Sequence, residues 1–418
     1  MKALWLSNGP VPLTSEAFGI DKSNVEGWKI QIFDRLIKEK DIELLYMFPS
    51  SLLSEMESKT YNGVSFARFN RNLPSDELIS NFVTYLKDFN PDIIHIWGTE
   101  YIHSYALTMA CKKLEMSSKV IISIQGLVSM YSFHYMGNIP GEVQCSATLR
   151  DFVKQDSLKR QQRSFIERGF YEQEAIKNVK HIIGRTFWDE ACSELINPAR
   201  IYHHNNETLR ECFYSKQWGV NSIEKHSIFV SQAYYPIKGF HNVLIAVNML
   251  KDKYPDLKIY VSGADNAFIK GVKIQGYGRY IQSLIKEYGL EHRVIYLGSL
   301  NETEMAERYL KSNIFVSASS IENSPNSVGE AMLLGMPVVS SNVGGVSDML
   351  VHNKEGFLYQ ADAPYMLAYY IDKFFKNKKL QLECGSNARN HALRTHDFDN
   401  NYRGLLEIYN EVCKTNGQ

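Results

Sequence analysis

Short apolar runs rich in β-branched residues recur along this 418-residue chain, and segments with helical periodicity separate them. Such runs over 91–98 and 119–126 end in glycine, as strands of a parallel sheet buried on both faces commonly do. Further strands are expected at 3–6, 42–48, 226–232, 258–262, 294–297, 314–316 and 337–340. This alternation predicts an α/β protein, with helices covering sheets of parallel strands.

The apolar periodicity lapses once, in a polar stretch over 215–225. We take that stretch as a domain boundary, because the length also suits more than one domain. Residues 1–217 and 226–394 are therefore predicted to form two doubly wound, Rossmann-like domains that face each other across a cleft. Residues 7–26 are expected to be a long loop after the first strand.

Charge and cysteine usage restrict the partners. Lysine plus arginine equals aspartate plus glutamate, at 46 each, so no overall field attracts nucleic acid, and we expect none as a partner. The six cysteines show no C-x-x-C spacing, which argues against a disulfide framework or a zinc site. No apolar stretch approaches the roughly 20 residues of a membrane span. The expected location is cytoplasmic, either free or peripheral at the inner face of the membrane.

A locally basic helix is predicted over 149–164, with five lysines and arginines against two aspartates. A solvated face is the interpretation we favour here. The alternative is a surface that approaches membrane lipid or an anionic acceptor.

The segment 317–341 carries two glutamates, Glu322 and Glu330, separated by seven residues across a strand-to-helix turn. Either Ser324 caps the helix with Pro325 at its first position, or Ser327 caps it with Glu330 as a capping box. In both cases free backbone N–H groups at the turn could hold an anion such as a diphosphate. The two carboxylates would then flank that anion, although two such glutamates alone are more typical of capping and of a solvated loop than of a binding site.

Two further motifs belong with this segment. Lys238 and Gly239 follow the strand 226–232, at the carboxyl end where open α/β sheets bind ligands, and a lysine there suits a phosphate. Gly344 and Gly345 follow the strand 337–340 and would let the backbone approach a ligand closely. A routine surface turn explains either motif when it is taken alone.

Other signals are weaker. His95 near the end of a buried strand either faces the cleft as an acid/base or acceptor contact, or is a satisfied core histidine. Asp397 and Asp399 have chelating spacing but stand at a helix entrance, so we interpret them as capping residues. No G-x-G-x-x-G follows the first strand, and the chain has no P-loop.

Taken in order, these pieces resemble the retaining glycosyltransferases of the GT-B fold, specifically glycosyltransferase family 4. The family's E-x7-E motif matches Glu322 and Glu330, its Lys-Gly turn matches Lys238-Gly239, and its Gly-Gly loop matches Gly344-Gly345. The resemblance implies that residues 1–217 bind the acceptor and 226–394 the nucleotide sugar. It also implies that 395–418 form a C-terminal helix that packs back on the N-terminal domain.

The resemblance implies a role for each site residue. Glu322 and Lys238 would be catalytic, with Glu322 at the hydroxyls of the donor sugar and Lys238 neutralising the diphosphate. Glu330 would hold the ribose hydroxyls. The remaining donor-binding candidates surround them: Gln232, Ser324, Asn326, Ser327, Gly344 and Gly345.

The chain departs from the family's pattern at three positions. Gln232 stands where an arginine usually precedes the Lys-Gly turn, and an amide cannot neutralise charge. Gln125 stands where many members carry a histidine, and Gly27 is what remains of an N-terminal glycine pair. Gly27, His95 and Gln125 are the acceptor-side candidates.

The implied reaction moves a sugar from a UDP- or GDP-sugar to a hydroxyl of a glycan or lipid-linked acceptor, with retention at the anomeric carbon. No metal or other cofactor is expected, and polysaccharide biosynthesis is the natural setting. Two alternatives stay open: a noncatalytic nucleotide-sugar or glycan-binding protein, and an NDP-sugar epimerase of related architecture.

Overall fold

The computed structural model describes residues 1–21, 27–51, 53 and 56–416. Its contacts group into two compact units. The first unit comprises Met1–Ser129, Ile166–Arg210 and His396–Gln418, and the second comprises Met130–Phe165 and Glu211–Thr395. Two helices, α5 (Val128–His134) and α8 (Leu158–Lys177), contain a unit boundary.

The described part of the first unit contains an eight-stranded sheet in the order β3-β4-β2-β1-β5-β6-β7-β8. All neighbouring strands are parallel except β3 and β4. The strands are β1 (Lys2–Leu6), β2 (Glu43–Ser50), β3 (Glu57–Tyr61), β4 (Val64–Asn70), β5 (Ile93–Trp97), β6 (Val120–Ser123), β7 (His181–Gly184) and β8 (Ile201–His204). The four strands predicted in this unit are therefore confirmed.

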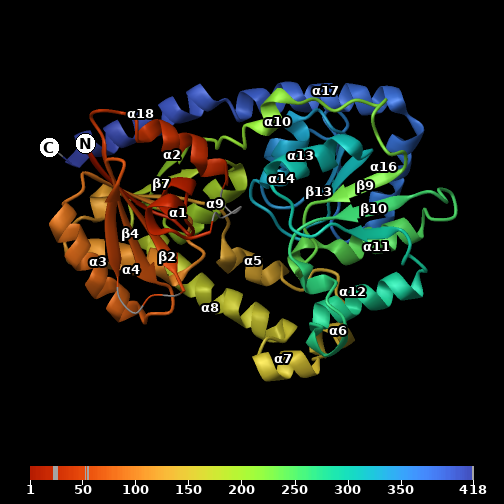
Figure 1. Cartoon of the computed structure of the whole chain (residues 1–418), viewed down its shortest axis with the longest axis horizontal. Coiled ribbons are helices and arrows are strands. Elements are labelled where there is room, and N and C mark those ends of the chain that lie inside the picture. The colour runs from red at the N-terminus through yellow and green to blue at the C-terminus, as the bar shows by residue number, and fades with distance from the viewer. Residues whose placement is uncertain (22–26, 52, 54–55, 417–418) are drawn as a thin grey trace. The chain divides into compact units, whose positions relative to one another are not determined.

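Helices surround this sheet (Figure 1). They are α1 (Pro12–Phe18), α2 (Ile30–Leu36), α3 (Ser75–Phe89), α4 (Ile102–Lys113), α9 (Phe187–Ile196) and α18 (Phe398–Asn416), with single 3-10 turns η1 (Gly27–Lys29) and η2 (Ser117–Lys119). The prediction of one long loop over 7–26 was wrong, because α1 lies within it. Pro12 starts that helix and Gly19, at φ 63°, ends it. Residues 22–26 lie outside the described residues.

The second unit contains a six-stranded sheet in the order β11-β10-β9-β12-β13-β14, and every neighbouring pair is parallel. The strands are β9 (Ser227–Val230), β10 (Lys258–Val261), β11 (Val294–Tyr296), β12 (Ile314–Ser317), β13 (Val338–Ser341) and β14 (Phe357–Tyr359). Five of these were predicted, and the three-residue β14 was not.

Helices cover this sheet as well (Figure 1). The helices of the second unit are α6 (Gly141–Cys145), α7 (Leu149–Lys154), α10 (Cys212–Ser215), α11 (Phe240–Asn248), α12 (Gly276–Glu287), α13 (Glu302–Lys311), α14 (Asn326–Leu333), α15 (Val346–Met349), α16 (Pro364–Lys376) and α17 (Lys378–Thr395). Single 3-10 turns are η3 (Pro236–Lys238), η4 (Asp265–Ala267) and η5 (Gly271–Lys273). The core lies between the sheet and α11, α12 and α16, and it includes Ile228, Val316 and Leu367.

The units differ from the predicted domains over two segments. Residues 130–165 group with the second unit, because Tyr131 Oη accepts a hydrogen bond from the Asn323 amide and Asp151 accepts one from the Gly276 amide. Residues 211–225 group with it too, and the indole of Trp218 donates to the Ser312 carbonyl at 2.8 Å. Periodicity cannot reveal either association, since each depends on contacts between residues far apart in the chain.

The predicted fold class is confirmed: the chain forms two α/β, Rossmann-like sheets of parallel strands with surrounding helices. Within the described residues, we find no helix whose length and hydropathy would let it cross a lipid bilayer.

Candidate active site

The strand order of the second unit determines where a ligand can bind. From β9 the chain adds β10 and then β11 on one side, and β12 returns to the other side of β9. This reversal is a topological switch point, and open α/β sheets bind ligands beside the carboxyl ends of the strands that flank it. The loops that follow β9 and β12 contain Lys238 and Glu322, so the topology brings these two predicted residues together.

Lys238 and Glu322 form an ion pair at the end of these loops. The Lys238 Nζ lies 2.6 Å from Glu322 Oε1, and the Ser319 hydroxyl donates to the same oxygen at 2.7 Å. The two side chains are 19% and 10% exposed. Burial lowers the pKa of Lys238, but the charge and hydrogen bond of Glu322, together with the neighbouring Tyr234 and Tyr235, raise it by more in sum, so its pKa lies above its usual value. Lys238 is therefore held as a cation.

Two glycines let the backbone pack tightly around this pair. Gly239 has φ 64°, and a Cβ there would stand 1.9 Å from the Ala318 carbonyl oxygen. Gly344 has φ 53°, and its Cβ would stand 1.9 Å from the Glu322 carbonyl oxygen. The Gly345 amide donates to that same oxygen at 3.1 Å. Only glycine suits both positions, which explains Gly239 of the Lys-Gly motif and Gly344 of the Gly-Gly motif.

The start of α14 differs from both capping alternatives. The helix begins at Asn326 with Pro325 as its N-cap, and no side chain caps it. Pro325 thus stands one position before the helix rather than at its first residue, because its ψ of 116° is extended. Ser324, Asn326 and Ser327 are half-buried at this terminus.

Glu330 lies one turn inside α14 and is 4% exposed. Its Oε2 is 3.5 Å from the Tyr309 hydroxyl, which also donates to the Ser327 carbonyl at 3.0 Å. Glu322 and Glu330 thus have different surroundings, one beside a lysine and the other beside a phenol. Gln232, after β9, is exposed.

Tyr131 is a site residue that the sequence did not indicate. It comes from α5, 192 positions before Asn323, and its hydroxyl oxygen accepts a hydrogen bond from the Asn323 amide at 3.0 Å. Burial raises the pKa of Tyr131 well above its usual value, and the charge of Glu322 raises it further while Lys238 lowers it. The phenol therefore stays neutral beside the ion pair. A lone tyrosine in a helix carries no signal that could have identified it.

The acceptor-side candidates lie in the first unit. His95 is fully buried, with Nδ1 2.6 Å from Tyr409 Oη and Nε2 2.7 Å from Ser123 Oγ. Its ring stacks on Trp97 at 3.9 Å, and burial lowers its pKa well below its usual value. The expectation of an acceptor contact does not fit these surroundings, which are those of a satisfied core histidine.

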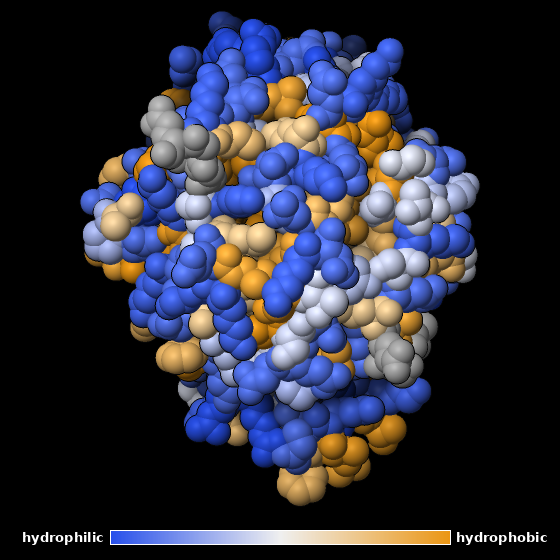
Figure 2. All heavy atoms as spheres, turned by 90° about the vertical axis from the view of Figure 1, so that its left-hand side faces the viewer, coloured by the Kyte–Doolittle hydropathy of each residue, from blue (hydrophilic) through white to orange (hydrophobic). Residues whose placement is uncertain are grey.

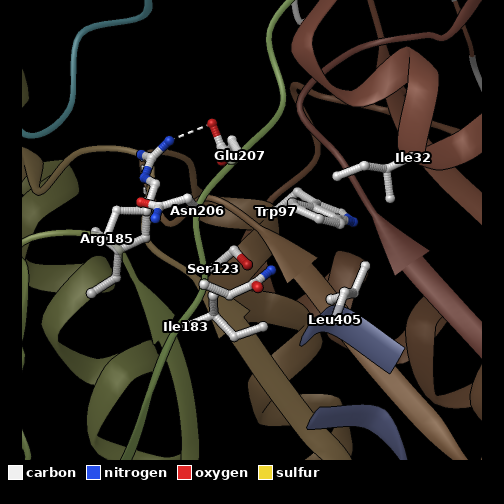
Figure 3. Close-up of a pocket in the computed structure, with 10 residues that line it drawn as sticks. Ile32, Trp97, Ser123, Ile183, Arg185, Asn206, Glu207 and Leu405 are labelled. Atoms are coloured by element: carbon white, nitrogen blue, oxygen red, sulfur yellow. Dashed lines mark hydrogen bonds and ion pairs between the residues drawn. The ribbon is translucent and has the colours of Figure 1, made fainter. Parts of the chain in front are cut away.

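Gln125 belongs to a polar network beside a small pocket (Figure 3). Its amide donates to Glu207 Oε1 at 2.5 Å, and Glu207 forms a buried ion pair with Arg185. Figure 3 shows this pair opposite the ring of Trp97. Arg185 and Glu207 were missed, because the loops after β7 and β8 carry no recognisable motif.

Gly27 begins η1, and a Cβ there would stand 3.0 Å from Arg210 Cδ. The structure thus brings together Lys238, Glu322, Gly344 and Gly345 in the second unit. It places Gly27 and Gln125 in the first unit.

Comparison with known proteins adds an independent observation. Residues 213–391 match the family model described as glycosyl transferases group 1. The chain is 22% identical over 361 residues to the putative glycosyltransferase YtcC of Bacillus subtilis, covering 85% of this chain and 80% of that protein. Another curated relative is matched over only about half of its own length.

Solved structures are similar over nearly the whole chain. Sucrose-phosphate synthase from Thermosynechococcus elongatus has a TM-score of 0.72 at 14% identity, with 99% of each chain covered. HepE from Anabaena, solved in complex with UDP and glucose, has a TM-score of 0.70 at 15% identity, with 98% of this chain and 100% of that chain covered. The chain therefore has the fold of the GT-B glycosyltransferases, and its residues 213–391 match the glycosyl transferases group 1.

Proposed function

We propose that this protein is a retaining glycosyltransferase that moves a sugar from a UDP- or GDP-sugar to a hydroxyl of a glycan or lipid-linked acceptor. The observation that carries the proposal is the Lys238–Glu322 pair beside the switch point of the second sheet. A lysine held as a cation at that place suits the diphosphate of a nucleotide sugar. HepE, a structural neighbour crystallised with UDP and glucose, supports a UDP-sugar as the first donor to test.

The proposed chemistry is departure of the nucleoside diphosphate. The bond between the anomeric carbon and the phosphate oxygen breaks, and the acceptor oxygen bonds to that carbon on the same face. The acceptor proton passes to the departing phosphate. Lys238 and the backbone amides at the start of α14 stabilise the negative charge that grows on the diphosphate. In this proposal no metal is needed, because these groups supply the positive charge.

Glu322 has two roles in this scheme. Its Oε1 already accepts from Lys238 and Ser319, which fixes the lysine toward the loop after β12. Its second oxygen would accept hydroxyls of the donor sugar. Glu330, one turn inside α14, would hold the ribose.

A noncatalytic nucleotide-sugar or glycan-binding protein is the second candidate. Gln232 favours it, since an exposed amide replaces the cation expected before the Lys-Gly turn. Release of free nucleoside diphosphate that depends on an acceptor would exclude this candidate.

A thermal-shift panel with UDP, GDP, ADP and their common sugar conjugates, with and without EDTA, tests donor binding first. A ligand that binds the folded state raises its apparent stability. We expect a shift with one uracil or guanine family that survives EDTA. A shift that EDTA abolishes would contradict the metal-free mechanism, and no shift with any nucleotide would contradict the donor site.

The two glutamates are expected to separate binding from transfer. Glu322→Gln should leave nucleotide affinity nearly unchanged and lower the transfer rate, because the sugar contact matters most as the bond breaks. Glu330→Ala should weaken nucleotide binding itself, since it removes the proposed ribose contact. Titration calorimetry with UDP and GDP measures the nucleotide affinity of each variant, and nucleotide release measures its transfer rate. Equal loss of affinity in both variants would contradict this division.

A further inference from the structure

The helix α7 presents an apolar face to solvent. Leu149, Phe152 and Val153 are 70%, 72% and 68% exposed. Their spacing of i, i+3 and i+4 places all three on one side of the helix. Figure 1 draws α7 at its lower edge, and Figure 2 shows hydrophobic residues at the lower edge of the molecule. Three large apolar side chains exposed together on one short helix are unusual, because each costs free energy in water.

The helix itself is firmly anchored to the second unit. Thr148 and Asp151 form a capping box at its start. The Asp151 carboxylate also accepts a hydrogen bond from the Gly276 amide at 2.9 Å, and the Thr148 hydroxyl donates to the Ile274 carbonyl at 2.8 Å. These bonds fix the opposite face of α7, so the apolar face is held outward.

Basic side chains flank this apolar face. Lys154 ends α7, and Lys159, Arg160 and Arg163 follow on the first turns of α8; all four are exposed. Among the described residues, none of these four pairs with a carboxylate. The two aspartates of the segment do not oppose them, because Asp151 is buried and Asp156 is paired with Arg150.

The turn η5, which packs against α7, has the same character. Val272 is 78% exposed, and Lys270 and Lys273 on either side of it are exposed as well. The whole chain has a formal net charge of zero, so this concentration of positive charge is local. We call the surface formed by Leu149, Phe152, Val153, Val272 and the flanking lysines and arginines the α7 patch.

We propose that the α7 patch docks this protein on a lipid bilayer that contains anionic phospholipids. An apolar face with a basic rim suits the boundary between headgroups and acyl chains, where the apolar side chains leave water and the cations meet lipid phosphates. An anionic glycan would use the cations but would leave the three apolar side chains in water. The proposal does not depend on the proposed function, since it concerns a different surface.

Co-sedimentation of the full chain with vesicles tests the proposal. We expect binding to vesicles of phosphatidylcholine with phosphatidylglycerol, and much weaker binding to phosphatidylcholine alone, with the difference falling as salt screens the charges. The variant Leu149→Asp/Phe152→Asp/Val153→Asp should lose more than about tenfold in bound fraction. Its matched control is Tyr365→Asp/Tyr369→Asp on α16, where the side chains are 61% and 55% exposed, and binding should not change.

The charge contribution is tested separately. The variant Lys159→Glu/Arg160→Glu/Arg163→Glu should lose about tenfold or more on the anionic vesicles. Lys378→Glu/Lys379→Glu, at two other exposed lysines, should bind as the unchanged protein does. Thermal unfolding of each variant checks that the fold is retained, since all the altered side chains are exposed.

Three results would overturn the proposal. The first is that the unchanged protein binds neither vesicle, and the second is that the aspartate variant binds as well as the unchanged protein. Binding of heparin that requires Lys159, Arg160 and Arg163, with no binding to either vesicle, would assign the patch to an anionic glycan instead.

Discussion

Replacement of Lys238 by methionine is expected to lower the rate of sugar transfer about a hundred- to a thousandfold, the usual effect of removing one preorganised donor at a growing negative charge. Lys238 is held at 2.6 Å from Glu322 beside the switch point, so its charge needs no rearrangement when the diphosphate departs. Methionine keeps much of the volume and removes the charge. Release of nucleoside diphosphate from the donor identified by thermal shift, in the presence of acceptor, measures the effect.

The same change also affects stability, and a second variant separates the two effects. Lys238→Met leaves the 10%-exposed Glu322 carboxylate without its cation, which typically costs about 3–5 kcal/mol for a buried pair. Lys238→Met/Glu322→Gln removes that uncompensated charge and should recover most of the stability without recovering transfer. If the double variant transfers sugar at the original rate, Lys238 has no catalytic role.

Gly239→Ala is expected to destabilise the protein by more than about 3 kcal/mol and to displace Lys238. The left-handed conformation at φ 64° costs an alanine about 1–2 kcal/mol by itself. In addition, the new Cβ would stand 1.9 Å from the Ala318 carbonyl oxygen, so the loops after β9 and β12 must separate. The denaturant midpoint and the nucleotide-induced thermal shift should both fall.

A matched control exists in the same unit. Gly289 also has φ 64°, but a Cβ there would meet nothing within 4 Å. Gly289→Ala should therefore show only the conformational cost and should keep nucleotide binding. An equal loss of stability in the two alanine variants would mean that close packing around Lys238 contributes nothing.

The elements predicted correctly share one property: their signal is local. β1, β5, β9 and β12 are short runs of apolar residues whose strand preference and burial need no distant partner to be recognised. Four strands of the first sheet, β3, β4, β7 and β8, were not predicted. Of these, β3 lies at a sheet edge and its residues are mostly exposed, so it shows no apolar pattern. The interpretation of Asp397 as a capping residue also rested on a local signal. Its carboxylate accepts a hydrogen bond from the Asn400 amide at the start of α18, as a capping residue does.

In the site, too, the residues with a local signal were predicted and those that depend on distant partners were not. Gly239 and Gly344 were visible in the sequence as parts of short motifs, and the structure shows the carbonyl oxygens of Ala318 and Glu322 whose closeness restricts these two positions to glycine. His95 could not be placed by sequence, because a histidine in a buried strand looks alike whether it faces a ligand or the Tyr409 hydroxyl. The apolar face of α7 was likewise hidden, because the predicted single basic helix over 149–164 is in fact two helices, α7 and α8, and only the structure shows Leu149, Phe152 and Val153 exposed together.

The sequence by itself determined two parallel α/β sheets and the motif residues at the ends of their strands, because strand propensity, helical period and glycine requirements act over a few neighbouring residues. Tertiary structure alone decided which residues meet. The strand order brought Lys238 to Glu322 across 84 positions, and the packing of α5 brought Tyr131 to Asn323 across 192. Such contacts depend on the three-dimensional path of the chain, which no local pattern encodes.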